Sequence, residues 1–523
     1  MVLHPRSWLY VLFAGICTTL FGACFELTED ERETSPDSGM RATGADAGPD
    51  HRNDGGQGAV GDGGDVDLNP DAGGLVDSGQ GGGLSQEDGG PVEDSGFDAG
   101  SLSVMDGGAN ATSAFYSATR IHSPINEAVV NRLIDIYNSD LSRADDVFLK
   151  AGASSTVSSR TLHCFAGDDV ELGSASELQS ALDYFLMGEA ADSTPFDRET
   201  VAALSGHSAG WVISGDPSPI QEEINMINPR FGFVHFGTND MGLGLTYATA
   251  MPNFYDNMME LFTLMVEQGV IPLVFGISPR LDSTNADKWV DTYNALIRGM
   301  AQAHQVPFID LHLATLGLVN YGMASDGIHL NYFADGACIL NAEGLEYGYN
   351  VRNLIALEVL DRMMRYVVED EELPGDASPS HIGLGTAQEP WLVHELPYGD
   401  YSDTRLSVSS ELDSYVGCDS AADESGPEWI YRLVVDEVTP IRALVMDGDD
   451  VDIDIHLLGA DISEASCLMR GHRFIEATLE PGTYHFVLDS WVDANNDVKS
   501  GEYLFAVVPC RDDDTDCSVA VSP

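Results

Sequence analysis

The sequence predicts an α/β fold followed by a small all-β region. Strand-like apolar runs near residues 147, 201, 233, 271 and 307 alternate with longer helical stretches. Such alternation is typical of a parallel sheet with helices on both faces. After residue 398, short alternating runs are separated by turn residues such as Pro481 and Gly482, which favours an antiparallel β-sandwich.

Three segments of the α/β region have helical patterns. Residues 251–268 and 289–304 are the clearest, and residues 349–369 are expected to close the region. Gly269 and Pro272 follow the first segment, as expected where a helix ends and a strand begins.

Changes in composition divide the chain into five parts. A proline- and glycine-containing break at residues 374–379 separates the two folded regions. We predict the following division: a signal peptide at 1–23, a disordered acidic tether at 24–112, an α/β domain at 113–370, a linker at 371–398 and a β-sandwich at 399–523.

The amino terminus has the pattern of a secretory signal. A short basic region precedes an apolar stretch at residues 8–21, which is short for a transmembrane helix of about 20 residues. Gly22, Ala23 and Cys24 follow, and they resemble the lipobox of bacterial lipoproteins. The resemblance implies cleavage before Cys24 and a lipid anchor on it, with ordinary secretion or an uncleaved anchor as alternatives. Phe25, which follows the expected lipid-bearing Cys24, does not match a signal for retention in the inner membrane, so we expect an outer-membrane lipoprotein of the cell envelope.

The chain is strongly acidic. It has 85 acidic and 24 basic residues, a formal net charge of −61. Nucleic acid and anionic lipid headgroups are therefore not expected as partners. Between residues 26 and 112 the composition falls to Gly, Asp, Ser, Ala and Pro, which cannot bury enough apolar surface to offset its ordering entropy.

Three short patches carry the residue types that ester hydrolysis needs. Ser154 follows a strand-like run, where an open α/β sheet places its ligand crevice. Asn239 follows a second such run and offers an amide donor for an oxyanion. Asp326 and His329 have the spacing of one helical turn, which suits a carboxylate that orients an imidazole. Together they predict a serine esterase that acts through an acyl-enzyme.

These patches resemble the SGNH hydrolases, also called GDSL-like esterases and lipases, over roughly residues 125–365. The resemblance implies a flavodoxin-like three-layer fold, an ester substrate and no cofactor. It also implies roles for five residues, with a Ser-His-Asp triad and two oxyanion donors: Ser154, His329, Asp326, Gly206 (backbone amide) and Asn239. The family usually has Gly-Asp-Ser at the nucleophile, whereas this chain has Ala153 before Ser154, and Ser155 is an adjacent candidate.

Two other interpretations remain open. Residues 206–210 spell Gly-His-Ser-Ala-Gly, the nucleophile turn of α/β-hydrolases, in which Ser208 would attack. No His-Gly-Gly oxyanion loop precedes Ser208, so we favour the first interpretation. Alternatively, the protein is a noncatalytic lipoprotein that binds envelope glycan or another surface component.

Histidines and cysteines outside the patches are expected to be structural. His163, His235 and His312 have no catalytic context, although His207 adjoins Gly206 and is a candidate to line the pocket. Once Cys17 leaves with the signal and Cys24 takes lipid, six cysteines remain, as expected in an oxidising compartment. We expect pairing within each domain: Cys164 with Cys338, and Cys418, Cys467, Cys510 and Cys517 among themselves.

The last region resembles the bacterial pre-peptidase C-terminal domain, on the stretches Asp450 to His456 and Leu479 to Tyr484. Two acidic clusters there raise the alternative of bound calcium. They are Asp447, Asp449 and Asp450, and separately Asp493, Asn495 and Asp497. The sequence leaves open which ester is cleaved, an acylated glycan, a lipid or a small acetyl ester, and the oligomeric state.

Overall fold

The structure is a computed structural model that describes residues 114–376, 378, 381–420 and 422–523. The predicted signal peptide, Cys24 and the acidic tether lie outside the described residues. Across the described residues, no helix combines the length and the apolar character needed to cross a membrane.

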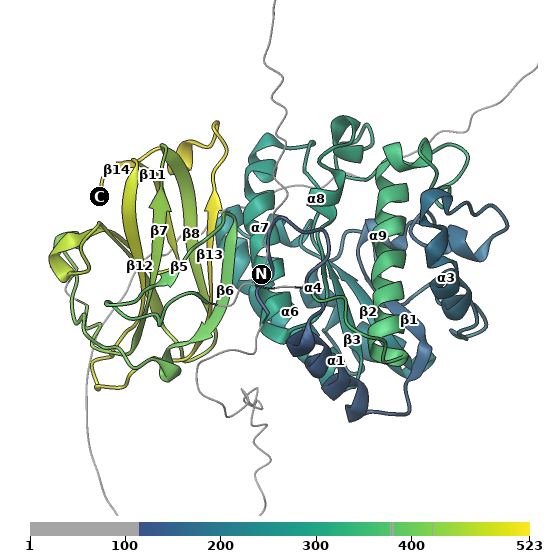
Figure 1. Cartoon of the computed structure of the whole chain (residues 1–523), viewed down its shortest axis with the longest axis horizontal. Helices are drawn as coiled ribbons and strands as arrows, with labels where there is room; N and C mark the ends of the chain where they lie inside the picture. Colours follow the sequence, from purple (N-terminus) through teal and green to yellow (C-terminus); the bar gives the residue numbers. More distant parts are fainter. Residues whose placement is uncertain (1–113, 377, 379–380, 421) are drawn as a thin grey trace, which may run out of the picture. The chain divides into compact units, whose positions relative to one another are not determined.

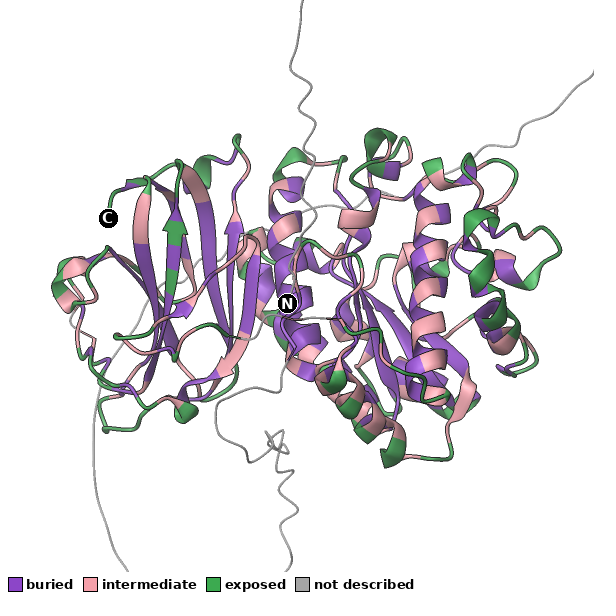
Figure 2. Cartoon of the chain, in the orientation of Figure 1, coloured by how far each residue is buried: buried purple, intermediate pink, exposed green. Residues whose placement is uncertain are grey.

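The predicted parallel sheet is present and has four strands in the order β1-β2-β3-β4. Its strands are β1 (Ala144–Gly152), β2 (Pro229–His235), β3 (Ile271–Phe275) and β4 (Phe308–Ile309). All residues of β2 and β3 are buried, as expected for strands covered on both faces (Figure 2). The register places Gly152, the last residue of β1, opposite His235, the last residue of β2.

Helices cover the sheet on both sides, and in Figure 1 the sheet lies between α9 on one side and α6 and α7 on the other. The longer helices are α1 (Glu127–Ser139), α3 (Gln179–Leu186), α5 (Pro219–Ile227), α6 (Tyr247–Glu267), α7 (Thr284–His304) and α9 (Gly348–Met363). Helix α3 packs against α9, and α6 packs against α7. This arrangement fits the predicted three-layer α/β fold.

Local sequence signals set where these helices begin and end. Helix α5 starts with a capping box of Ser218 and Gln221, and α7 starts after Ser283, whose side chain accepts from the Ala286 amide. The helix predicted at 251–268 begins earlier, at Tyr247, because the Thr246 side chain caps it. The segment predicted at 349–369 is α9, which continues as a π-helical turn (Met364–Val368).

The prediction of a strand near residue 201 is wrong. Only an isolated bridge joins Ala203 to Gly152 at this edge of the sheet. Two backbone bonds hold it, from Gly152 N to Ala202 O (3.2 Å) and from Leu204 N to Gly152 O (3.1 Å). Its apolar run is only four residues long and Leu204 is exposed, so there is too little buried surface to extend the pairing.

The last region contains two five-stranded sheets, in the orders β10-β9-β12-β7-β5 and β14-β11-β8-β13-β6. The strands are β5 (Trp391–Leu392), β6 (Tyr398–Asp403), β7 (Glu428–Val435), β8 (Thr439–Asp447), β9 (Ile453–Leu458), β10 (Cys467–Gly471), β11 (Phe474–Leu479), β12 (Gly482–Ser490), β13 (Glu502–Pro509) and β14 (Ala520–Val521). Most neighbours are antiparallel, but β5 pairs with β7 and β14 with β11 in parallel. These mixed sheets share a buried core that includes Tyr431 and Phe505, which is consistent with a sandwich. The predicted linker at 371–398 holds β5 and the start of β6.

Helix α7 is packed by the second of these sheets as well as by the α/β core. Leu444, Met446 and Leu504 belong to the same buried cluster as the parallel sheet. A Cβ on Gly299 of α7 would lie 2.8 Å from Leu504 Cδ1, so a larger residue there would have to displace the leucine. The guanidinium of Arg442 lies 3.5 Å from the centre of the Trp289 ring.

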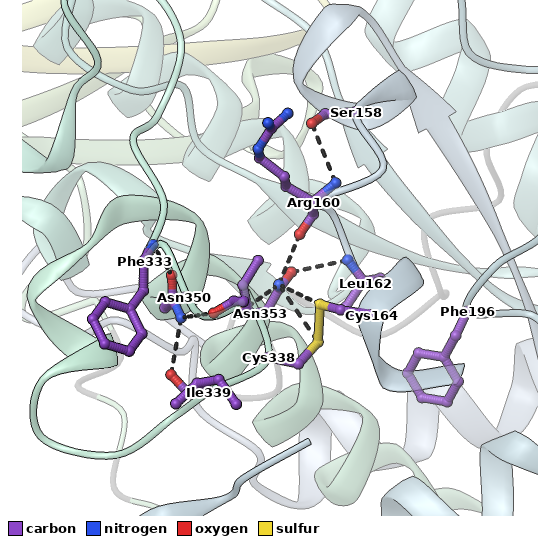
Figure 3. Close-up of a disulfide and its surroundings, with 12 residues drawn as sticks. Ser158, Arg160, Leu162, Cys164, Phe196, Phe333, Cys338, Ile339, Asn350 and Asn353 are labelled. Carbon is purple, nitrogen blue, oxygen red and sulfur yellow. Dashed lines mark hydrogen bonds between the residues drawn. A yellow bond between two sulfur atoms is a disulfide. The ribbon is translucent and has the colours of Figure 1, made fainter. Parts of the chain in front are cut away.

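The six cysteines of the described chain form three disulfides, each within one predicted domain as expected. They are Cys164–Cys338, Cys418–Cys467 and Cys510–Cys517. The first joins the segment after Ser154 to the segment after His329. Figure 3 shows this bond beside Asn353, whose amide donates to Arg160 O (2.9 Å) and Ala337 O (3.1 Å).

Loop length predicts which disulfide matters most for stability. Cys164 and Cys338 are 174 residues apart, whereas Cys510 and Cys517 are 7 residues apart. Chain entropy then predicts that the double variant Cys164→Ser/Cys338→Ser loses about 5 kcal/mol of unfolding free energy. The matched control Cys510→Ser/Cys517→Ser loses about 2 kcal/mol. Urea unfolding without reductant measures both, and equal losses would contradict the chain-entropy explanation.

Candidate active site

Ser154 lies in the first turn after β1, as the sequence predicts. It is the first residue of the short helix α2 (Ser154–Val157), and Ala153 is the N-cap without a side-chain cap bond. A Cβ on Gly152 would lie 2.2 Å from Thr156 Oγ1 and 2.9 Å from His235 O. Close packing, and not an unusual backbone angle, therefore requires glycine at position 152.

A buried arginine supports this turn from beneath. Arg352 of α9 is 2% exposed, and its guanidinium donates to Ser155 O (2.6 Å) and Thr161 Oγ1 (2.7 Å). Burial lowers the pKa of Arg352 to about 10, which still leaves the side chain charged at neutral pH. The backbone carbonyl beside Ser154 is thereby fixed by a charge-assisted hydrogen bond.

Asp326, His329 and Ser154 form one continuous hydrogen-bonded chain. Asp326 Oδ2 lies 2.8 Å from His329 Nδ1, and His329 Nε2 lies 2.8 Å from Ser154 Oγ. The expected helical turn is instead the tip of a hairpin, closed by a bridge between Met323 and Leu330. Asp326 Oδ1 accepts from the amides of Ile328 and His329 (both 3.0 Å), which fixes the carboxylate.

The electrostatics of the Asp326–His329–Ser154 network favour a charged Asp326 carboxylate. Partial burial raises the pKa of Asp326, but the His329 amide, the His329 ring and the Ile328 amide together lower it to about 2. The carboxylate is therefore charged at neutral pH and accepts a hydrogen bond from His329 Nδ1–H. His329 Nε2 is then free to accept the proton of the Ser154 hydroxyl.

The two expected oxyanion donors come from neighbouring loops. Asn239 follows β2, and one hydrogen of its side-chain amide is donated to His207 O at 2.9 Å. Gly206 has a φ of +78°, which favours glycine. Asp240 joins the two loops, because its carboxylate accepts from Gly237 N (3.0 Å) and Ala209 N (2.9 Å).

These residues surround a pocket of about 280 Å³. Its lining consists of Ala153, Ser154, Ser155, Gly206, His207, His235, Phe236, Gly237, Thr238, Asn239, Ile328 and His329. Four of the five expected site residues line it, and Asp326 stands behind His329. His207 also lines it.

His235 has a different place from the one expected. The sequence suggested a purely structural residue, yet His235 lines the pocket while only 7% exposed. Neither ring nitrogen has a hydrogen-bond partner, and burial with Arg352 nearby lowers its pKa well below the usual value. A neutral imidazole therefore forms part of the pocket wall. By contrast, His312 is held by Asp291 at 3.2 Å, as expected of a structural residue.

Ser208 has none of these connections. It is the N-cap of the short helix α4 (Ala209–Val212) with φ −105° and ψ 172°, an ordinary extended conformation. Among the described residues, no hydrogen bond joins Ser208 to His329. The Gly-His-Ser-Ala-Gly segment instead provides Gly206 and His207 to the pocket wall.

Candidate metal ligands lie outside this pocket. Among the described residues, three groups have ligand atoms close enough for one ion: Cys510, Asp514 and Cys517; Glu424, Asp454 and His456; and Asp452, Asp454 and His472. The first contains disulfide cysteines. None of the acidic residues considered for calcium is in these groups; Asp493, for example, accepts from the amides of Asn495 and Asp497.

Residues 179–333 match the GDSL-like Lipase/Acylhydrolase family. The matched segment includes Gly206, Asn239, Asp326 and His329, whereas Ser154 precedes it. No curated protein matches the chain.

The chain is also similar to solved structures of other proteins. A GDSL-like lipase from Bacteroides thetaiotaomicron VPI-5482 is 13% identical, with 45% of this chain and 98% of that chain covered and a TM-score of 0.28. A putative acylhydrolase from Bacteroides fragilis NCTC 9343 is 15% identical (46% and 100% covered, TM-score 0.28). A catalytic mutant of an acetylxylan esterase from Geobacillus stearothermophilus is 10% identical (42% and 95% covered, TM-score 0.29). The family match supports a GDSL-like lipase/acylhydrolase domain at residues 179–333.

Proposed function

We propose that the protein is a serine esterase in which Ser154 attacks the acyl carbon of an ester. The observation that carries the proposal is the unbroken chain from Asp326 through His329 to Ser154, with 2.8 Å at each step, at the wall of the pocket. As Ser154 Oγ bonds to the acyl carbon, His329 Nε2 takes its proton and Asp326 stabilises the imidazolium. The Gly206 amide and the Asn239 side chain donate to the oxyanion.

The second half of the cycle reverses these proton movements. His329 gives its proton to the leaving alcohol as the carbon–oxygen bond breaks, which leaves an acyl group on Ser154. Water then attacks this acyl-enzyme while His329 takes a proton from it. The acid leaves and the Ser154 hydroxyl is restored.

We further propose that the esterase works in the cell envelope, held by a lipid on Cys24. The basic, apolar and small-residue pattern before Cys24 supports this location, as does the presence of three disulfides. The acidic tether would hold the catalytic region away from the membrane surface. The substrate class we propose is an acyl ester carried by an envelope glycan or lipid.

A fluorophosphonate probe tests the nucleophile. We expect the probe to modify Ser154, and Ser154→Ala to lose esterase activity by at least about 10³-fold because no other group replaces the nucleophile. Ser155→Ala and Ser208→Ala are matched controls that keep activity within a few-fold.

The position of the label separates the competing functions. Modification of Ser208 in place of Ser154, identified by peptide mass spectrometry, would overturn the assignment in favour of the α/β-hydrolase motif. A chain that reacts with no probe and cleaves no ester would support the noncatalytic binding protein.

Asp326→Asn tests the orienting carboxylate. The asparagine oxygen keeps the bonds from the Ile328 and His329 amides, but its NH₂ group faces His329 Nδ1 and favours the wrong tautomer. We expect kcat to fall by up to about 10⁴-fold with little change in KM or in melting temperature. A loss of less than a few-fold would show that His329 acts without Asp326.

Pocket size predicts a preference for short acyl groups. A volume of about 280 Å³ is at the lower end of small-molecule sites. We expect kcat/KM for p-nitrophenyl acetate to exceed that for p-nitrophenyl octanoate by at least about tenfold. The reverse order would show that long chains bind outside the pocket; Leu243 and Leu245, which follow Asn239 in the chain and are exposed, are candidate contacts for them.

A further inference from the structure

A row of buried acidic residues crosses the sheet β10-β9-β12-β7-β5. Asp489 of β12 lies opposite Asp454 of β9 on one side and opposite Glu428 of β7 on the other. All three are at most 2% exposed. Like charges directly opposite each other on neighbouring strands destabilise a sheet, and burial increases the cost. Burial raises the pKa of Glu428 and of Asp489, and neighbouring groups must offset the charge that remains on the row.

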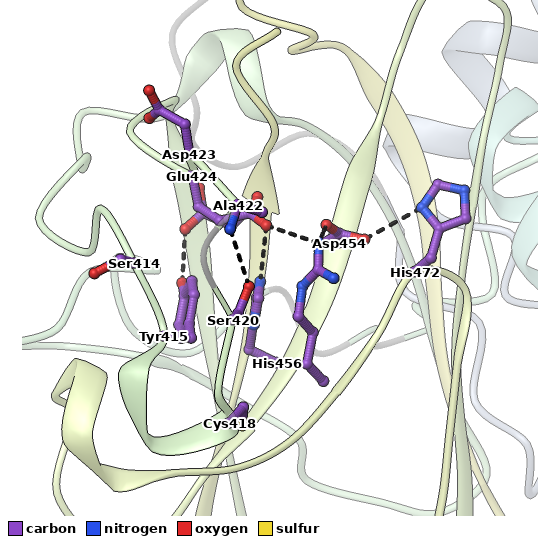
Figure 4. A network of polar contacts seen from close by, with 12 residues as sticks. Ser414, Tyr415, Cys418, Ser420, Ala422, Asp423, Glu424, Asp454, His456 and His472 are labelled. Atoms are coloured by element: carbon purple, nitrogen blue, oxygen red, sulfur yellow. Dashed lines mark hydrogen bonds and ion pairs between the residues drawn. The ribbon is translucent and has the colours of Figure 1, made fainter. Parts of the chain in front are cut away.

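A loop adds a fourth buried carboxylate, that of Glu424, which has no exposed surface. The Cys418–Cys467 disulfide fastens this loop to β10. Tyr415, from the same loop, stacks on His456 of β9 with ring centres 3.4 Å apart and planes 9° from parallel. Figure 4 shows Glu424, Asp454 and His456 converging under the loop.

Protein groups satisfy only part of this network. Glu428 accepts from the amides of Glu411 (2.9 Å) and Leu412 (3.2 Å), and Asp489 Oδ2 accepts from Tyr415 Oη at 2.6 Å. Asp489 Oδ1 and Glu424 Oε2 have no partner among the described residues.

Two basic side chains reach the network from its rim. Arg470 of β10 donates to Glu424 Oε1 (3.0 Å) and to Asp454 Oδ2, and its side chain is 30% exposed. His472 Nδ1 lies 3.2 Å from Asp454 Oδ1, and its side chain is 58% exposed. Of the four buried carboxylates, these two side chains contact those of Glu424 and Asp454.

His456 is the observation that points to a ligand. It is 0% exposed, and neither ring nitrogen has a hydrogen-bond partner, although a buried unpaired polar group is costly. His456 Nε2 faces Glu424 Oε1 at 3.9 Å. Asp454 lies two residues before His456 on β9, so both side chains project from the same face of the strand.

We propose that Glu424, Asp454 and His456 bind one divalent transition-metal ion of the zinc class. One ligand atom from each lies within 4.8 Å of the others, so one ion can contact all three. One imidazole and two carboxylates suit Zn²⁺ better than Ca²⁺, which prefers six to eight oxygens. The two positive charges of the ion balance the carboxylates of Glu424 and Asp454, and the ion occupies the position that the Arg470 guanidinium otherwise holds. Arg470 can turn outward because its side chain reaches solvent.

Calorimetry on the full chain tests the proposal. After removal of metals with a chelator, the protein is titrated with Zn²⁺, and in parallel with Mn²⁺ and Ca²⁺. We expect one equivalent of Zn²⁺ to bind and to raise the melting temperature, with Ca²⁺ at least about tenfold weaker. The X-ray absorption spectrum of the zinc form is expected to show one imidazole with oxygen ligands.

Four variants locate the ion. Glu424→Gln and His456→Phe each weaken Zn²⁺ binding by at least about tenfold, and the phenylalanine keeps the stacking on Tyr415. His472→Gln is the matched control, because it removes the histidine of the neighbouring group that shares Asp454, and it leaves binding unchanged. Arg470→Met tightens binding, because it removes the competing cation.

Three results would overturn the proposal. One is the absence of Zn²⁺ binding to the wild-type chain at micromolar concentrations. Another is binding that Glu424→Gln and His456→Phe leave intact but His472→Gln removes, which would place the ion in the neighbouring group. The third is an Arg470→Met chain that is destabilised and that Zn²⁺ does not restore, which would show that arginine is the only counterion the network accepts.

Discussion

The parallel pairing of β1 with β2 is the constraint on which the site depends. Because Gly152 and His235 lie opposite each other, the two strands end at the same level of the sheet. Ser154 and Asn239 each follow within four residues and so reach the same edge. His329 comes from a hairpin far along the chain, and the Cys164–Cys338 disulfide ties that part of the chain to the segment after Ser154. Hydrogen bonds then set the final distances, but the register of two strands decides which groups can meet.

The sequence predicted most of the α/β region because its signals are local. Apolar runs near 147, 233, 271 and 307 became strands, and the three helical segments became α6, α7 and α9. The run near 201 was too short to hold more than one bridge. The five expected site residues lie in compact motifs that stand out in the sequence, and the structure brings four of the five to one pocket, while their catalytic roles stay a prediction. Arg352 and His235 could not be singled out from the sequence, because their places depend on burial and on distant parts of the chain. Arg352 contacts Ser155, 197 residues before it, and His235 pairs with Gly152, 83 residues before it.

The contrast between local motifs and contacts distant in the chain also explains which acidic residues of the last region could be singled out from the sequence. Clusters such as 447–450 and 493–497 attract notice because their acids are close in sequence, yet Asp493 uses its carboxylate to accept backbone amides in a turn. The buried group of Glu424, Asp454 and His456 joins a loop to a strand 30 residues later. In the sequence, the only sign of this group is the Asp-x-His spacing of Asp454 and His456, and that spacing is too common to identify a site by itself.

The packing of helix α7 against both folded regions means that the two regions are not independent modules. Its residues pack against the parallel sheet on one side and against Leu504 and Arg442 on the other, so neither region supplies its whole hydrophobic environment. An α/β region cut free at the predicted linker would present the apolar flank of α7 to water, as an exposed patch of the kind that promotes association. The β-rich region is therefore part of the same folding unit as the parallel sheet. Joining it to another α/β region would need a partner helix that leaves room for Leu504, as Gly299 does here.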